Sequence, residues 1–418
     1  MLKGLGGARV GKLFSLLLAV CIVFVMVACN QQSGPSSSAS SPIKIGLTIS
    51  KTGDFSQDGA ALLQGYQIWA DYVNSHGGLF DNRKVQLDIL NDNSTSTQAI
   101  TDYQKLINVN HDDLILGPYS SSLTLSVAPV AQRYNYAFIE GAGVAPKIFQ
   151  GGFSNLFSVS LSASDYLKSF VAYLLSMPQA QRPKSIAYVT AQDFFTQPQV
   201  DGARTLLEQG GIKTAIYETY PAETTDYSPI AQKAIATKPD VVILGTTSQS
   251  DAVGLTKAFI QQHFNPKALI ETAGPDQGSQ FTGPIGGVAN AEGIFVPNNG
   301  WFPTIQSYQN SDFVSAFIKK YGGTAQDISA DSVEAFSAGQ VLQQAISKAN
   351  SIDNAKLVQE LHSNDTFNSI QGAVKFKSDG ENTVAEPFLF QWQKGALIPV
   401  YPANQAQANP EYPKKSWS

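Results

Sequence analysis

Hydrophobic residues along positions 43–139 follow two periodicities in turn. Short apolar runs predict β-strands, and apolar residues three or four positions apart predict amphipathic helices. In residues 57–74 the large apolar side chains share one helical face, and Gly77-Gly78 ends the helix. The members of that face are Leu62, Tyr66, Trp69 and Val73.

Strands and helices are expected to alternate in two series. The first series has strands at 43–49, 85–90, 114–116 and 136–139, with helices at 57–74, 97–108 and 122–134. The second has strands at 185–189, 213–217, 241–244 and 268–270, with helices at 200–209, 228–236 and 251–263. Such alternation favours parallel sheets with right-handed crossovers. The predicted fold class is α/β with two lobes, each a mainly parallel sheet with helices on both faces.

The C-terminal third adds a different pattern. Residues 292–296 read as a further strand, and helices are expected at 312–321 and 331–349. Residues 371–377 and 388–393 are expected to form an antiparallel pair that turns at Ser378-Asp379-Gly380.

The N-terminal residues have the pattern of an export signal. Lys3, Arg9 and Lys12 precede an uncharged apolar run, residues 13–28, which is short for a membrane span. The Ala28-Cys29 junction resembles a bacterial lipobox, in which the cysteine is lipidated and becomes the first residue. We therefore expect a signal peptide at 1–28 and a lipid on Cys29, with a plain transmembrane anchor as the alternative.

The segment after Cys29 is expected to be a flexible tether over residues 29–42. Residues 30–42 contain six serines, two prolines and one glycine but no charge, so they cannot form a packed core. Both cysteines of the chain occur before residue 30, which excludes a disulfide framework in the remainder.

Composition and charge exclude several function classes. With 43% hydrophobic and 15% charged residues, the chain is expected to be globular. Its formal net charge is −5, and without the three basic residues before Cys29 the remainder carries −5 less 3, or −8. Since no stripe of lysine and arginine opposes this charge, we expect no nucleic-acid partner.

Catalytic and metal-binding signals are weak. The four histidines, His76, His111, His263 and His362, are too far apart to form a recognisable metal motif. No phosphate-binding loop, G-x-S-x-G or H-E-x-x-H motif is present. We expect no metal, no cofactor and no enzymatic activity.

The most informative residues follow two strands of the first series. Ligands of open parallel sheets bind beyond the carboxyl ends of the strands, where helix N-termini offer free N–H groups. Ser120, Ser121 and Ser122 precede a predicted helix, and this site suits a carboxylate; the alternative is that one serine serves only as the helix N-cap. After the next strand, Ala142 and Gly143 form a turn that a ligand could approach, or a purely structural turn.

Several motifs together resemble the branched-chain amino-acid binding protein family, the solute receptors of ABC importers with the type I periplasmic-binding fold. The resemblance covers residues 43–392. The motifs are Ile43-Lys44-Ile45-Gly46, Asn74-Ser75-His76-Gly77-Gly78, Gly117-Pro118-x-Ser-Ser, Ala128-Pro129-Val130-Ala131 and Tyr220-Pro221-Ala222-Glu223-Thr224-Thr225-Asp226-Tyr227.

The resemblance implies two lobes joined by three crossing segments that close over a ligand. Lobe I is expected to comprise residues 43–160 with 295–366, and lobe II residues 161–294 with 367–402, followed by a tail at 403–418. The crossings are expected near 158–162, 292–296 and 364–370.

The family's ligand residues transfer only in part. The resemblance implies that Ser121 holds a ligand carboxylate and that Ala142 offers a carbonyl. Val144 stands where the family has threonine, and Phe195 or Phe194 stands where it has tyrosine. The acid that pairs with a ligand ammonium falls near Ser250, which is followed by Asp251.

Other residues are candidates to complete the site. Asp58, Asp251 or Asp276 could replace the missing acid, although such aspartates are more often caps or turn residues. An apolar or aromatic subsite could be formed by Phe194, Phe195, Tyr119 and Trp301. We also expect Ser121→Ala to weaken ligand binding without changing the melting temperature of the empty protein.

The expected function is that of an extracytoplasmic receptor, anchored to the membrane through Cys29. It would capture a small solute with a carboxylate or amide group and deliver it to an ABC permease, and it is expected to be a monomer. One alternative is a related sensor module of a signalling system. The other is a hydrolase that uses a serine of residues 120–122, for which the sequence shows no base.

Overall fold

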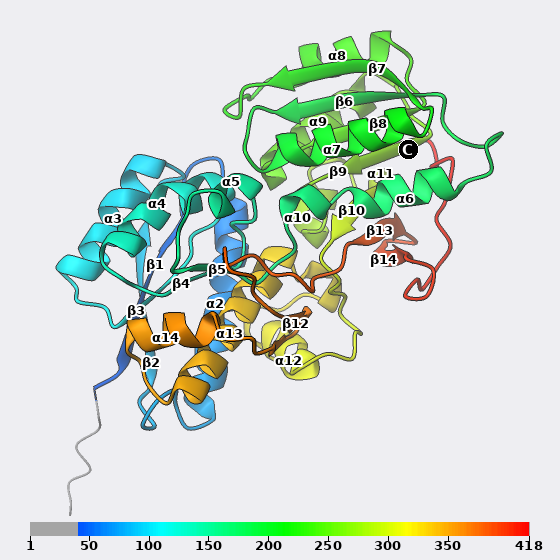
Figure 1. Cartoon of the computed structure of the whole chain (residues 1–418). Coiled ribbons are helices and arrows are strands. Elements are labelled where there is room, and N and C mark those ends of the chain that lie inside the picture. The colour runs from blue at the N-terminus through cyan, green and yellow to red at the C-terminus, as the bar shows by residue number, and fades with distance from the viewer. Residues whose placement is uncertain (1–40, 418) are drawn as a thin grey trace, which may run out of the picture. The chain divides into compact units, whose positions relative to one another are not determined.

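Two β-sheets organise the part of the chain that the structure describes, residues 41–417 of a computed structural model (Figure 1). The predicted signal peptide, Cys29 and residues 30–40 of the predicted tether lie outside the described residues.

The first sheet is parallel throughout, with the strand order β2-β1-β3-β4-β5. Its strands are β1 (Ile43–Ile49), β2 (Val85–Asn91), β3 (Leu114–Leu116), β4 (Phe138–Glu140) and β5 (Leu156–Ser158). The helices of its βα units are α2 (Ser56–Ser75), α3 (Ser96–Asn108), α4 (Ser121–Arg133) and α5 (Pro146–Phe149). One face of the sheet packs on α3 and α4 and the other on α2, which confirms the predicted parallel sheet with two helical layers.

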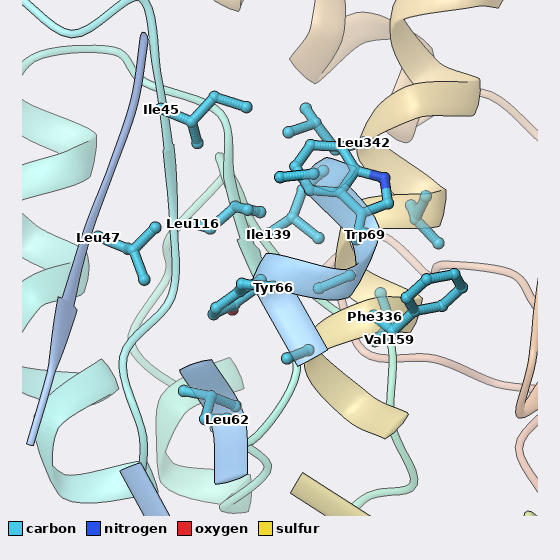
Figure 2. Close-up of a cluster of buried hydrophobic side chains, with 14 of the residues drawn as sticks. Ile45, Leu47, Leu62, Tyr66, Trp69, Leu116, Ile139, Val159, Phe336 and Leu342 are labelled. Atoms are coloured by element: carbon cyan, nitrogen blue, oxygen red, sulfur yellow. The ribbon is translucent and has the colours of Figure 1, made fainter. Parts of the chain in front are cut away.

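Later helices join the α2 side of this sheet. They are α12 (Asn310–Tyr321), α13 (Ala330–Ala349) and α14 (Asn354–Leu361), with the short hairpin β11 (Phe367–Ser369) and β12 (Gly372–Val374) beside them. Figure 2 shows Tyr66 and Trp69 of α2 with Phe336 and Leu342 of α13 in one buried cluster.

Glycines allow α2 and α13 to approach closely. A Cβ on Gly339 of α13 would lie 2.3 Å from the Trp69 ring, and one on Gly65 of α2 would lie 2.1 Å from the Ser332 carbonyl oxygen. The Ser332 hydroxyl also donates to the Ala61 carbonyl at 2.6 Å. This contact fixes the N-terminal turns of the two helices, which carry functional candidates described below.

The second sheet has the order β14-β13-β10-β9-β8-β6-β7. Its parallel strands are β6 (Ser185–Ala191), β7 (Lys213–Tyr220), β8 (Val241–Gly245), β9 (Ala268–Glu271) and β10 (Ile294–Asn298). Antiparallel strands β13 (Phe388–Gln393) and β14 (Ala396–Tyr401) complete one edge. Its helices are α6 (Lys168–Ser176), α7 (Thr196–Gln209), α8 (Ser228–Ala236), α9 (Gln249–Gln261), α10 (Gly278–Thr282) and α11 (Val288–Ala291). Buried clusters cover both faces.

The predicted pairing of 371–377 with 388–393 is wrong. The turn at Gly380 exists, with a φ of 86° and a hydrogen bond from its N–H to the Lys377 carbonyl, but β12 pairs back onto β11. Strand β13 instead turns at Lys394-Gly395, where both φ angles are positive, and pairs with β14. Two positive φ angles match the twist of a two-residue hairpin. The sequence interpretation did not consider Lys394-Gly395 as such a turn.

Two of the expected crossing segments lie later in the chain than predicted, because the residues predicted to cross belong to one of the two sheets or its core. Residues 294–298 form β10 inside the second sheet, so the chain returns to the first sheet after Asn298 rather than at 292–296. Phe367, Ile370 and Val374 are buried in the core of the first sheet, so the last crossing follows residue 376 instead of lying at 364–370. The expected C-terminal tail packs on the second sheet, where the Lys414 N–H donates to the Lys267 carbonyl.

Candidate functional site

A cavity lies beyond the carboxyl ends of strands from both sheets, as expected for open parallel sheets. It contains about 710 Å³ of empty space, its open mouth included. The structure brings half of the fourteen candidate residues together at its wall. They are Asp58, Tyr119, Ser120, Ser121, Ala142, Phe195 and Asp276.

Ser121 connects the start of α4 to the next turn of the first sheet. Its buried Oγ accepts hydrogen bonds from the N–H groups of Val144 and Ala145, each at 3.1 Å. The hydroxyl proton remains available to a ligand, but the oxygen also connects the start of α4 to the turn at residues 144–145. The expectation that folding barely depends on Ser121 therefore needs correction.

Ser120 is the N-cap of α4 and has a strained backbone. Its Oγ accepts a hydrogen bond from the Leu123 N–H. Its φ of 79° and ψ of 150° lie in a backbone region that residues with a side chain rarely adopt. Such strain costs about 1–3 kcal/mol and is concentrated at functional sites. Its position at the cavity wall agrees with a functional role for this turn.

Three other candidates of these turns lie away from the cavity. The Ser122 hydroxyl pairs with that of Ser120 at 2.9 Å. Val144 is buried in a small apolar cluster with Leu161. Gly143 has a packing role, because a Cβ there would lie 2.4 Å from Thr124 Oγ1.

Four more candidates also lie away from the cavity wall. Ser250 is exposed, and its neighbour Asp251 accepts hydrogen bonds from Tyr227 and Thr247, so neither forms the cavity wall. Phe194 is 42% exposed. Trp301 is buried, and its indole N–H donates to Asn310 Oδ1 at 2.7 Å.

Asp58 lies in the first turn of α2 and reaches the helices of the second sheet. Its Oδ1 accepts from the Gln249 N–H of α9 at 3.2 Å and from Gln277 Nε2 at 2.6 Å. The Tyr119 hydroxyl makes a second connection of this kind, since it donates to the Thr247 carbonyl at 3.0 Å. The two sheets are therefore connected directly across the cavity.

Two acids at the start of α13 were missed in the sequence. Asp331 and Glu334 both line the cavity. Glu334 Oε1 accepts from Asn299 Nδ2 at 2.9 Å and from the Tyr166 hydroxyl at 3.4 Å. An acidic residue at the start of a helix is usually interpreted as a partner of the helix dipole. Glu334, however, is flanked by the apolar Val333 and Ala335, and this pattern could have indicated a buried carboxyl group.

Burial and mutual repulsion raise the pKa values of these carboxyl groups. Burial raises the pKa of Asp58 to about 7, against the hydrogen bonds from Gln249 and Gln277, and the charge of Asp276 adds to the effect. The pKa values of Asp331 and Glu334 rise well above their usual range, through burial first and neighbouring carboxylates second. Burial likewise raises the pKa of Asp276.

Aromatic rings from both sheets line the same cavity. Phe55 and Tyr119 meet edge to face at a centroid distance of 5.4 Å, and Tyr166 and Phe195 do the same at 5.4 Å. The predicted aromatic subsite thus has its geometric counterpart in Tyr119 and Phe195, with Phe55 and Tyr166 not foreseen.

Metal-binding clusters and membrane-spanning helices are both absent from the described residues. Between residues 41 and 417, no three histidine, cysteine, aspartate or glutamate side chains are arranged to hold a metal ion. In the same range, no helix has the length and apolarity that crossing a membrane requires.

Comparison with known proteins assigns the family. The family model described as periplasmic binding protein matches residues 42–396. The chain belongs to this family. The Leu/Ile/Val-binding protein homolog 7 of Brucella melitensis is 26% identical over 379 residues, which cover 87% of this chain and 92% of that relative.

Solved structures of periplasmic binding proteins share the fold. The branched-chain amino acid transporter substrate-binding protein LivJ from Streptococcus pneumoniae, in complex with isoleucine, has a TM-score of 0.74 at 17% identity and covers 85% of this chain and 97% of its own. A solute-binding protein of an ABC transporter from R. palustris, in complex with benzoate, has a TM-score of 0.72 at 17% identity and covers 90% and 98%. The predicted type I periplasmic-binding fold is confirmed.

Proposed function

We propose that this protein is the extracytoplasmic, membrane-anchored receptor of an ABC importer. It captures a small polar solute in the cavity between the two sheets and delivers it to the permease. The observation that carries the proposal is the cavity itself, which loops at the carboxyl ends of strands from both sheets enclose. The family assignment and the relatives that bind amino acids or benzoate support it.

The two sheets define the lobes that close over the solute. Lobe I contains the first sheet with α12–α14, and lobe II contains the second sheet. The cross-sheet hydrogen bonds of Asp58 and Tyr119 represent the closed form. A permease can read closure because the relative position of the lobes changes with occupancy.

Ser121, Ser120 and Ala142 contact an oxygen-bearing part of the solute in this proposal. The first N–H groups of α4 lie beside them and favour an anionic or polar group. Phe195 supplies an aromatic wall, and Asp58 and Asp276 supply charge.

The anchor is a lipid on Cys29, supported by the basic residues and the apolar run before it. The tether at 29–42 then keeps the receptor near the membrane surface. The receptor acts as a monomer.

Binding is favoured over catalysis by the surroundings of the serines. The hydroxyl oxygen of Ser121 faces two N–H groups, and the described residues at the cavity wall include no histidine or lysine that could activate it. The remaining alternative, a sensor module, would use the same cavity.

Uptake measurements separate import from sensing. The compound released when the purified protein is denatured is identified by mass spectrometry, and its uptake is measured in cells with and without the gene. Import requires that deletion abolishes high-affinity uptake and that the wild-type gene restores it. Unchanged uptake together with tight binding would assign the protein to sensing.

A further inference from the structure

Among the described residues, the cavity wall combines several carboxyl groups with no basic side chain. Five carboxyl side chains line it, and the described lining residues include no lysine, arginine or histidine. The five are Asp58, Asp193, Asp276, Asp331 and Glu334. None of them takes part in the ion pairs formed within residues 41–417.

Within residues 41–417, the donors to this cluster of carboxyl groups are neutral. Gln277 Nε2 lies between Asp58 Oδ1 and Asp331 Oδ2, at 2.6 and 3.4 Å. Asp276 Oδ2 accepts from the Ala330 N–H at 2.8 Å. When the carboxyl groups ionise, these donors leave them without a counter-charge, and burying an uncompensated charge is strongly unfavourable.

A buried amide at the wall also lacks a donor. Asn299 is 5% exposed and lines the cavity. Its Nδ2 donates to Glu334, while its Oδ1 accepts no hydrogen bond from any residue in the range 41–417. Such an orphaned acceptor calls for an N–H group of a ligand.

The aromatic rings suit the same kind of ligand. Tyr119 and Tyr166 use their hydroxyl groups on Thr247 and Glu334, so they present ring surface rather than donors. A cation near an aromatic face is attracted by the negative charge density of the ring.

We propose that the solute carries a net positive charge, with more ammonium or guanidinium groups than carboxylates. A short diamine, an aromatic amine or a basic amino acid fits this description. A zwitterion brings only one positive charge and a negative charge besides, and an aromatic carboxylate would add a sixth negative group. The proposal rests on the proposed receptor function and specifies its solute class.

Two matched pairs of compounds test the sign of the charge. Benzylamine and benzoate share a ring but carry opposite charges, and lysine and norleucine differ by one ammonium group. Binding to the purified protein is measured by calorimetry at pH 8. We expect the amine of at least one pair to bind about 10-fold to 100-fold more tightly than its partner, as for one charge-assisted hydrogen bond.

The pH dependence gives an independent readout. The titratable groups that face the solute are the five carboxyl groups. The hydroxyls of Tyr119 and Tyr166 are bonded to Thr247 and Glu334, and the charge of Glu140 acts on Glu334 as well. A cation prefers ionised carboxylates, so its affinity should fall about tenfold from pH 8 to pH 6 for each group with a pKa near 7. A carboxylate bound by protonated acids would instead bind more tightly at pH 6.

Substitutions locate the effect. Glu334→Gln keeps the shape and removes a charge from the wall, and we expect about a tenfold or larger loss of amine affinity. Glu271→Gln is the matched control, because Glu271 is also a buried glutamate with a raised pKa but lies outside the cavity, and it should leave the affinity unchanged. Asp331→Asn gives a second variant in case Glu334→Gln folds poorly.

The results of these experiments decide whether the solute carries a net positive charge. If any of the four compounds binds but neither pair favours its amine, or if the affinity for the amine rises on acidification, the proposal is overturned. If none of the four compounds binds, the net charge of the compound released from the purified protein decides the question. Uptake is a separate test, because a bound cation that cells do not import would leave the solute class intact and refute the import function.

Discussion

Replacing Asp58 with asparagine should stabilise the empty protein at neutral pH. The Asp58 carboxyl is 1% exposed, lies near Asp276 and has no cationic partner, so its ionised form is disfavoured in the folded state. In the unfolded chain the same group ionises freely. The amide of asparagine resembles the protonated acid and can still accept from the Gln249 N–H.

The magnitude follows from the shift in pKa. A rise from 3.8 to about 7 in the folded state is about three units, or about 4 kcal/mol at about 1.4 kcal/mol per unit. A raised pKa means that the folded state holds the proton longer than the unfolded state. The contribution of Asp58 to stability is therefore fully present below pH 4 and is lost as the pH rises to about 7. The stability difference between Asp58→Asn and wild type should be near zero at pH 4 and reach at most about 4 kcal/mol at pH 8.

Urea unfolding at pH 4, 6 and 8 measures this difference. Two optical probes must give coincident transitions, since a protein with two lobes can unfold in steps. Asp240→Asn is a control of opposite sign: burial alone would raise the pKa of Asp240, but the side chain of Lys267 and the N–H of Lys184 outweigh it and lower the pKa. That variant should lose stability at pH 8 and recover it on acidification. A difference for Asp58→Asn that does not change between pH 4 and pH 8 would refute the reasoning.

Three further predictions address the serine turn, the anchor and closure. Ser121→Ala should lower the free energy of unfolding by about 1–3 kcal/mol for each of the two N–H groups that lose their acceptor, as measured by urea unfolding, and weaken solute binding as well; unchanged stability would argue against the structural role. Cys29→Ser should abolish lipid labelling and leave the protein unprocessed or released from the membrane, and normal labelling would exclude Cys29 as the anchor. Solute at 100 times its dissociation constant stabilises the form that binds it by about 2.7 kcal/mol, so small-angle scattering should show a smaller radius of gyration, and an unchanged profile would favour a receptor that is already closed when empty.

The fold was largely predictable because periodicity depends on local sequence. The strand 43–49 was predicted with its observed bounds, and the helix 57–74 was observed at Ser56–Ser75. Pairing between distant strands depends on turn geometry, and there the prediction failed. The hairpin was predicted at Gly380, but the chain forms it at Lys394-Gly395. A glycine in a turn does not indicate which strands the turn connects.

The site was only half predictable for a related reason. Ser120, Ser121 and Ala142 directly follow strands, so their position at the sheet edge could be inferred from the chain order. Asp331 and Glu334 reach the cavity because α13 packs on α2 through Gly65 and Gly339. No local pattern records that long-range contact.

The distribution of charge over the two lobes connects solute recognition to closure. Asp58, Asp331 and Glu334 belong to helices of the first lobe, whereas Asp276 follows a strand of the second. Burial first, and then the charges of Asp58 and Asp276, raise the pKa of Asp331. In the proposed closure, an empty cavity would bring like charges together, which would disfavour the closed form. A cation between them reverses the sign of that interaction, because each carboxylate then faces a positive group. Since a ligand shifts a hinge only by its preference for one state, the acids would make closure conditional on a solute of the right charge. The same groups that destabilise the empty receptor would thus keep it from presenting a closed, unloaded form to the permease.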